Sequence, residues 1–117
     1  MYELNNRAVE LSRKGELQGA LDLFFLAFEQ NPSDYKLPFN IGLVYLKKED
    51  YENAIEYFER SVNIKRDDDN LRELAVAYIK IQNFDKAKSA LEFAIECYNS
   101  SDSNNVLGVL YFLNHEY

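Results

Sequence analysis

Few side chains in this sequence could carry chemistry. His115 is the only histidine and Cys97 the only cysteine of the chain, and they lie far apart. A histidine-based catalytic triad needs a nucleophile beside the imidazole, and a structural zinc site needs several Cys or His ligands. We therefore expect a solvated His115 side chain and a buried, structural Cys97 thiol.

The acidic run "RDDDN" at residues 66–70 offers carboxylate oxygens, which are ligands for calcium. It lacks the glycine and the distal glutamate that an EF-hand loop places at fixed spacing. We interpret it as the start of a helix, where carboxylates interact favourably with the positive end of the dipole. No phosphate loop, GxGxxG or HExxH motif occurs, so we predict no enzyme activity, no cofactor and no metal site.

Composition predicts one soluble helical domain. The chain has 117 residues, of which 47% are hydrophobic and 28% charged, and only four Gly and two Pro interrupt it. The formal net charge of -7 disfavours nucleic acid as a partner. No apolar run approaches the roughly 18 residues of a membrane span, and a lone cysteine fits a reducing compartment. We expect no membrane insertion and a cytoplasmic location, unless a leader has been removed.

Three segments of the sequence align without gaps, at residues 15–32, 49–66 and 82–99. Each has an alanine, a large apolar residue four positions later and a small residue three positions after that. The residues at these positions are Ala20, Phe24 and Ala27; Ala54, Phe58 and Ser61; Ala87, Leu91 and Ala94. This spacing predicts an amphipathic helix in each segment.

The segments before these three also align, because each has a small residue three positions before a larger one. The pairs are Ala8 and Leu11, Gly42 and Tyr45, Ala75 and Tyr78. The unit is therefore helix, short turn, helix, at residues 1–34, 35–67 and 68–100, with the first helix of a fourth unit at 101–117. Glycine costs a helix roughly 0.5–1 kcal/mol relative to alanine, so we expect Gly42 to make room for the partner helix.

This pattern resembles the tetratricopeptide repeat (TPR), a 34-residue unit with preferred residues at eight positions. Matches in register run through nearly the whole chain, and the departures are Arg7, Pro38, Arg66 and Asn99. The resemblance implies an all-α fold: a right-handed superhelical array of antiparallel helix pairs. It would form a single domain of about three and a half repeats and seven helices.

In the TPR family, ligands contact the first helices of the repeats, on the concave surface of the array. The resemblance places apolar side chains there, with a basic edge formed by the last residues of those helices. The predicted groove consists of Val9, Arg13, Phe39, Asn40, Leu43, Leu46, Lys47, Arg72, Val76, Ile79, Lys80, Val109 and Phe112. Phe39, Leu43 and Leu46 are expected to be side chains that packing within the repeat does not use.

The carboxylate clamp with which some TPR proteins bind acidic C-terminal peptides is not expected here. Its positions hold Asn5, Val9, Asn40, Asp69 and Glu73, of which only Asn40 matches. An apolar groove suggests an apolar or amphipathic segment of a partner protein instead. Two alternatives remain for the apolar row: packing within the array, or self-association. The basic edge has an alternative too, since cations stabilise helix C-termini.

The last expected helix is apolar around its whole circumference between residues 106 and 113. A terminal helix of a repeat array is expected to be polar on its outer face. Either further repeats follow Tyr117 in the native chain, or another chain covers this helix, for example in a homodimer. The array could also be the regulatory domain of a larger protein.

Overall fold

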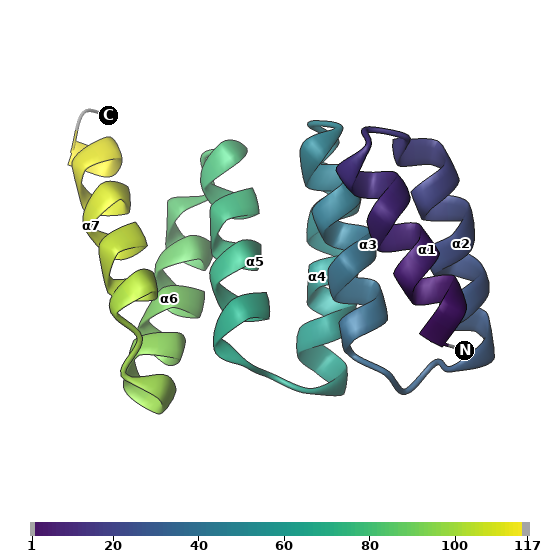
Figure 1. The fold of residues 1–117 in the computed structure, drawn as a ribbon. Helices are drawn as coiled ribbons and strands as arrows, with labels where there is room; N and C mark the ends of the chain where they lie inside the picture. The colour runs from purple at the N-terminus through teal and green to yellow at the C-terminus, as the bar shows by residue number, and fades with distance from the viewer. Residues whose placement is uncertain (1, 116–117) are drawn as a thin grey trace. The chain divides into compact units, whose positions relative to one another are not determined.

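The computed structural model describes residues 2–115, with side chains from residue 3 to residue 114, and the regular secondary structure of this part is entirely α-helical. The expectations for the His115 side chain and for Tyr117 concern atoms outside this description. The helices are α1 (Tyr2–Arg13), α2 (Leu17–Gln30), α3 (Lys36–Lys47), α4 (Tyr51–Ile64), α5 (Asp68–Lys80), α6 (Phe84–Tyr98) and α7 (Ser101–His115) (Figure 1). The predicted order of helix pairs is confirmed within the described residues.

The helices fall into two compact units, residues 1–65 with α1 to α4 and residues 66–117 with α5 to α7. In the first unit α1 packs on α2, α2 on α3 and α3 on α4; in the second, α7 packs on both α5 and α6. The expectation that both belong to one continuous array stays a prediction.

The small residues of the repeat lie where the helices of a pair meet. Ala20, Ala54 and Ala87 are fully buried, and so are Phe58 and Leu91, the large residues that follow two of them. At Gly42 of α3, an added Cβ would lie 2.6 Å from two ring carbons of Phe58. The glycine is therefore needed for the close approach of α3 and α4, as its position in the repeat predicts.

The turn inside each helix pair has the same backbone geometry. Gly15, Glu49 and Gln82 adopt left-handed conformations, with φ of 85°, 61° and 64°. The amide that follows each of them donates to the carbonyl five residues back, as in Glu16 to Leu11 at 2.9 Å. This is a Schellman ending, which favours glycine because a side chain strains a left-handed backbone. Only the first repeat has the glycine.

The acidic run at residues 66–70 caps a helix, as predicted. Asp67 accepts from the backbone N–H of Asn70 at 2.8 Å, and the Asn70 side chain accepts from the N–H of Asp67 at 2.9 Å. This capping box starts α5, and Asp68 and Asp69 occupy its first turn. The carboxylates of this run therefore stabilise the start of α5.

In the second unit, Asp68 at the start of α5 links this helix to the start of α7. Its carboxylate accepts hydrogen bonds from the hydroxyls of Ser100 and Ser103, both at 2.9 Å, and pairs with Arg72 at 2.7 Å. The Ser100 hydroxyl in turn accepts from the backbone N–H of Ser103. The first turns of α5 and α7 are thereby held side by side.

Candidate peptide-binding clefts

The first unit has a cleft between α1 and α3, with a volume of about 340 Å³. It is lined by Val9, Ser12 and Arg13 of α1, Phe24 of α2, and Asn40, Leu43, Val44, Leu46 and Lys47 of α3. Phe24 and Val44 are buried and form its floor, whereas Leu43 and Leu46 are half-buried. Six of the thirteen residues predicted for the groove meet in this cleft.

Hydrogen bonds across the cleft hold α1 and α3 in register. The Asn40 side-chain amide donates to Asn5 Oδ1 at 3.3 Å, and Lys47 Nζ donates to Ser12 Oγ at 3.1 Å. Both pairs join residues 35 positions apart in the sequence. Equivalent positions of successive repeats therefore lie next to each other, which gathers the apolar side chains of the two helices into one row.

The cleft has a positive end. Arg13 is the last residue of α1 and Lys47 the last residue of α3, and both side chains are exposed. Within the described part of the chain neither one forms an ion pair with a carboxylate. Helix C-termini favour cations, yet two such cations beside an apolar cleft also leave positive charge available to a ligand.

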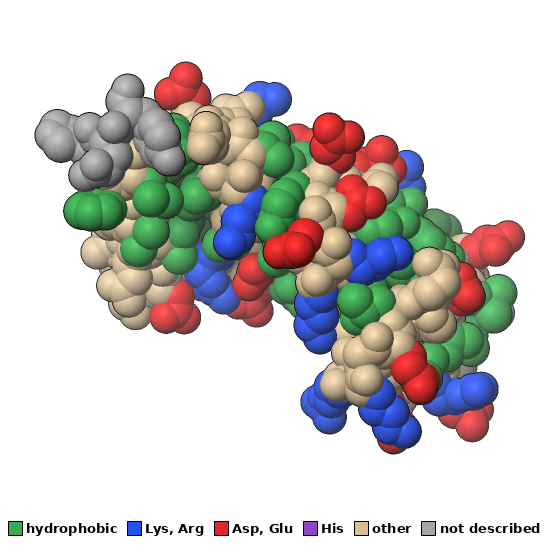
Figure 2. Space-filling view, turned by 90° about the horizontal axis from the view of Figure 1, so that it is seen from above, with side chains coloured by type: hydrophobic (Ala, Val, Ile, Leu, Met, Phe, Trp, Pro, Cys, Tyr) green, Lys and Arg blue, Asp and Glu red, His purple; other side chains and the backbone are tan. Residues whose placement is uncertain are grey.

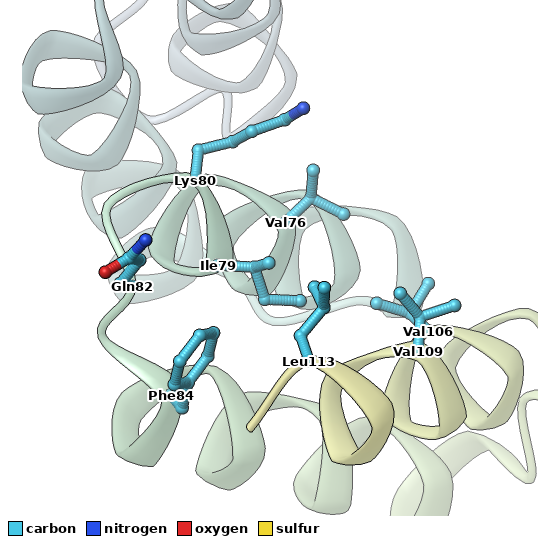
Figure 3. Close-up of a pocket in the computed structure, with 8 residues that line it drawn as sticks. All are labelled: Val76, Ile79, Lys80, Gln82, Phe84, Val106, Val109 and Leu113. Atoms are coloured by element: carbon cyan, nitrogen blue, oxygen red, sulfur yellow. The ribbon is translucent and has the colours of Figure 1, made fainter. Parts of the chain in front are cut away.

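A second cleft, of about 450 Å³, lies in the second unit between α5 and α7. Its lining consists of Val76, Ile79, Lys80, Gln82, Phe84, Val106, Val109 and Leu113. Figure 3 shows Ile79 of α5 and Leu113 of α7 pointing toward each other, with Lys80 extending away from the cleft. Four predicted groove residues, Val76, Ile79, Lys80 and Val109, meet here.

Three predicted groove residues lie outside both linings. The Phe39 ring packs on Phe58 with the centroids 5.8 Å apart, so it takes part in the contact between α3 and α4 that it was expected to leave unused. Phe112 is 67% exposed on α7 and lines neither cleft. Arg72 is held by two carboxylates of its own helix.

The Arg72 guanidinium forms ion pairs with Asp68 at 2.7 Å and Asp69 at 2.8 Å. Burial alone lowers the pKa of Arg72, but the hydrogen bonds and charges of Asp69 and Asp68 outweigh it and raise that pKa above its ordinary value. Only 17% of its side chain is exposed. Arg72 therefore stabilises the first turn of α5, and a ligand would have to displace two carboxylates to reach it.

Cys97 is exposed, and the prediction of a buried thiol is wrong. The buried stripe of α6 consists of Ala87, Leu91 and Ala94, and Cys97 lies in the last turn off this stripe. The neighbouring apolar residues in sequence suggested burial, but the helical period turns Cys97 outward. Among the described residues no group of three His, Cys, Asp or Glu side chains could hold a metal ion.

Sequence reasoning missed the cleft residues that come from other parts of the repeat. Phe24 was assigned to the packing of a helix pair, and its burial under α1 and α3 also makes it a cleft floor. Gln82 and Phe84 belong to a turn and the start of a second helix. Val106 and Leu113 could have been found, because the sequence shows that the last helix is apolar around its whole circumference.

Comparison with known proteins identifies the repeats. Residues 37–113 match the family described as "Tetratricopeptide repeat protein 21 forth ARM domain". The chain belongs to this TPR family. The human protein "Tetratricopeptide repeat protein 21A" is 35% identical over 81 residues, which is 69% of this chain and 6% of the human protein. The TPR chain therefore spans only a small part of the length of these relatives.

Solved structures agree with the TPR fold. The structure titled "First TPR of Spaghetti (RPAP3) bound to HSP90 peptide SRMEEVD" superimposes with a TM-score of 0.90 over 97% of this chain and 92% of its own, at 18% identity. YrrB, described as "a TPR protein with an unusual peptide-binding site", gives 0.77 over 86% of this chain and 53% of its own, at 27% identity. Within residues 2–115 no helix is long and apolar enough to cross a bilayer.

Proposed function

We propose that this TPR chain is a protein-interaction module that holds an apolar or amphipathic segment of a partner protein in its clefts. The observation that carries the proposal is the α1–α3 cleft, where half-buried Leu43 and Leu46 lie beside Val9, and Arg13 and Lys47 have no carboxylate partner in the described chain. Residues Val76, Ile79 and Val109 give the α5–α7 cleft the same apolar character. No catalytic step is proposed.

The expected affinity follows from the side chains that a ligand would cover. Completing the burial of Val9, Leu43 and Leu46 contributes at most roughly 1.5–3 kcal/mol each, or about 5–9 kcal/mol together. Association costs roughly 4–15 kcal/mol before any contact is counted. The surplus is at most about 5 kcal/mol, so one cleft alone predicts a weak complex, with a dissociation constant of about 0.2 mM or weaker.

The proposed ligand differs from the acidic peptide of the RPAP3 complex. That peptide, SRMEEVD, carries several carboxylates. In this chain Asp69 and Glu73 occupy positions at which the TPR carboxylate clamp has cations, and Asp69 is already paired with Arg72. Apolar burial in the clefts is therefore the main contribution, with Arg13, Lys47 and Lys80 attracting carboxylates at the edge of the ligand. We also propose that the partner is a cytoplasmic protein.

The test is a selection from a phage-displayed library of random 16-residue peptides on the whole chain, followed by fluorescence anisotropy with the selected peptides. We expect Leu43→Asp to weaken binding at least tenfold, because a charge in the cleft is buried by the ligand without a partner. Leu26→Asp is the matched control, since Leu26 is 44% exposed on α2 and lines neither cleft.

Circular dichroism of both variants must first show unchanged helix content. The proposal fails if Leu43→Asp leaves the affinity of every selected peptide unchanged, or if the two variants weaken binding equally.

A further inference from the structure

One end of the α1–α3 cleft brings together two cations and a hydroxyl group. Ser12 and Arg13 of α1 and Lys47 of α3 line this end, and Lys47 Nζ donates to Ser12 Oγ at 3.1 Å. Because the hydroxyl accepts this bond, its own proton can be donated to another group, and the ammonium group has two further protons to donate. Three different donor groups from two helices therefore lie at one end of the cleft.

The residues that follow these two cations in the sequence are engaged elsewhere. Lys14 forms an ion pair with Glu10 at 3.5 Å, and Lys48 Nζ lies 5.8 Å from the centroid of the Tyr45 ring. Figure 2 views the chain from above, onto the ends of α1 and α3, and shows Lys and Arg side chains exposed beside hydrophobic ones. The first cation of each pair remains available to a ligand, since among the described residues neither one forms an ion pair.

The charge at this end differs in sign from that of the chain. Arg13 and Lys47 line the cleft and no Asp or Glu does, whereas the whole chain has a formal net charge of -7. Helix C-termini carry a partial negative charge, which opposes an anion here. A ligand group with one negative charge leaves one of the two cations uncompensated, whereas a group with two negative charges compensates both. The electrostatics therefore favour a doubly charged anion.

The donor groups favour the same kind of ligand. A phosphate monoester carries a charge of about −1.5 to −2 at pH 7 and has three strong acceptor oxygens. A guanidinium group donates two parallel hydrogen bonds, and an ammonium and a hydroxyl group donate one each to the same anion. Three donor groups match the three oxygens of a phosphate better than the two oxygens of a carboxylate. Ser12, Arg13 and Lys47 also occupy none of the positions of the TPR carboxylate clamp.

We propose that this end of the cleft binds a phosphorylated serine or threonine of the partner segment. The inference rests on the proposed function, because apolar side chains of the same segment must lie along Leu43 and Leu46. Leu43 and Lys47 are four residues apart on α3, or about 6 Å along its axis, which an extended segment spans with about two residues. The preferred ligand is therefore an extended segment with the phosphorylated residue two positions from an apolar one.

The probes are three synthetic peptides of the form Leu-Ala-Leu-Ala-X, with serine, phosphoserine or glutamate as X. Glycines flank this sequence, and the peptides are acetylated and amidated. Each is titrated into the ¹⁵N-labelled whole chain up to about 5 mM, because a ligand of one cleft is expected to bind weakly. We expect the phosphoserine peptide to bind at least tenfold more tightly than the serine peptide, with the glutamate peptide between them. Its ³¹P signal should shift on binding, and its advantage should fall as the NaCl concentration rises from about 0.05 M to about 0.5 M.

Two matched pairs of protein variants test the residues of the site. Lys47→Gln removes one of its cations, and Lys48→Gln removes the next cation in the sequence, which lies over the Tyr45 ring. We expect Lys47→Gln to lower the ratio of the serine to the phosphoserine dissociation constant from at least ten to about two or three, and Lys48→Gln to leave it unchanged. Arg13→Gln and Lys14→Gln are the equivalent pair on α1. Equal ratios within both pairs would contradict the proposal.

Leu43→Asp separates this inference from the proposed function. If the cleft holds the apolar side chains, this variant weakens binding of the serine peptide at least tenfold. That loss, together with equal affinities of the serine and phosphoserine peptides for the unchanged chain, would overturn the phosphate site alone. Unchanged binding of the serine peptide by Leu43→Asp would refute the proposed function. No binding of the phosphoserine peptide up to about 5 mM, or equally tight binding of inorganic phosphate, would also overturn the inference.

Discussion

Gly42→Ala tests the packing on which the repeat is built. The new Cβ would lie 2.6 Å from two ring carbons of Phe58, whereas carbon atoms in contact are about 3.5–4.0 Å apart. The ring must therefore move by roughly 1 Å, and Phe39 packs against it at a centroid distance of 5.8 Å. Overpacking of this kind costs about 1–3 kcal/mol.

The helix propensity of alanine offsets part of this cost, by roughly 0.5–1 kcal/mol. We expect a net destabilisation of about 1 kcal/mol for Gly42→Ala, with an upper bound near 2.5 kcal/mol. Gly108→Ala gains the propensity without the clash, since nothing lies within 4 Å of its Cβ. The two variants should therefore change stability in opposite directions, and their difference isolates the contact with Phe58.

The assay is urea unfolding followed by circular dichroism at 222 nm and, because the chain has two compact units, by amide signals from each unit separately. Gly42→Ala is expected to shift the midpoint of the first unit downward and Gly108→Ala that of the second unit upward. If Gly42→Ala stabilised its unit as much as Gly108→Ala does, the close contact of Gly42 with the Phe58 ring would not require a glycine.

Three further predictions concern the left-handed turn at Gln82, the half-buried carboxyl of Glu73, and the hydrogen bonds of Asp68. Gln82→Gly should stabilise the chain by about 0.5–1 kcal/mol in urea unfolding, because Gln82 has a φ of 64°, a left-handed conformation that strains a residue with a side chain. A lower stability of the variant would show that this turn is not strained. Burial, helped by Asp69 and opposed by Arg72, raises the pKa of the Glu73 carboxyl. Its neutral form is thus favoured by folding, and its stability contribution is lost as pH rises from about 4.5 through the folded pKa. Glu73→Gln should therefore raise the melting temperature more at pH 7 than at pH 4. A larger rise at pH 4 would mean that folding lowers the pKa of Glu73 and would contradict this prediction. Asp68→Ala removes an ion pair and two hydroxyl hydrogen bonds, and should cost about 1–3 kcal/mol, measured by urea unfolding against Asp102→Ala on the exposed surface of α7.

The helix pairs could be predicted from the sequence because their signals are local and repeat. Ala54 and Phe58 lie four residues apart on one helix face, and both are fully buried where the period places them. Gly42 could be predicted because close helix packing requires a missing side chain at a fixed position of the repeat.

The remaining features depend on contacts between distant parts of the chain. Phe39 was expected in the groove, but its ring reaches Phe58 of the next helix. The left-handed backbone of Glu49 and Gln82 follows from the shared Schellman geometry, although neither residue favours it. Arg72 lies on α5 as expected, but its ion pairs with Asp68 and Asp69 neutralise the positive charge that was predicted to face a ligand.

The most direct test of the proposed function is a methyl NMR titration of the ¹³C-labelled chain with a peptide selected by phage display. We predict that the methyl signals of Leu43, Leu46 and Val9 shift first and saturate together, with a dissociation constant of about 0.2 mM or weaker. Saturating shifts confined to Leu26 and Ile64, which are 44% and 39% exposed outside both clefts, would contradict it.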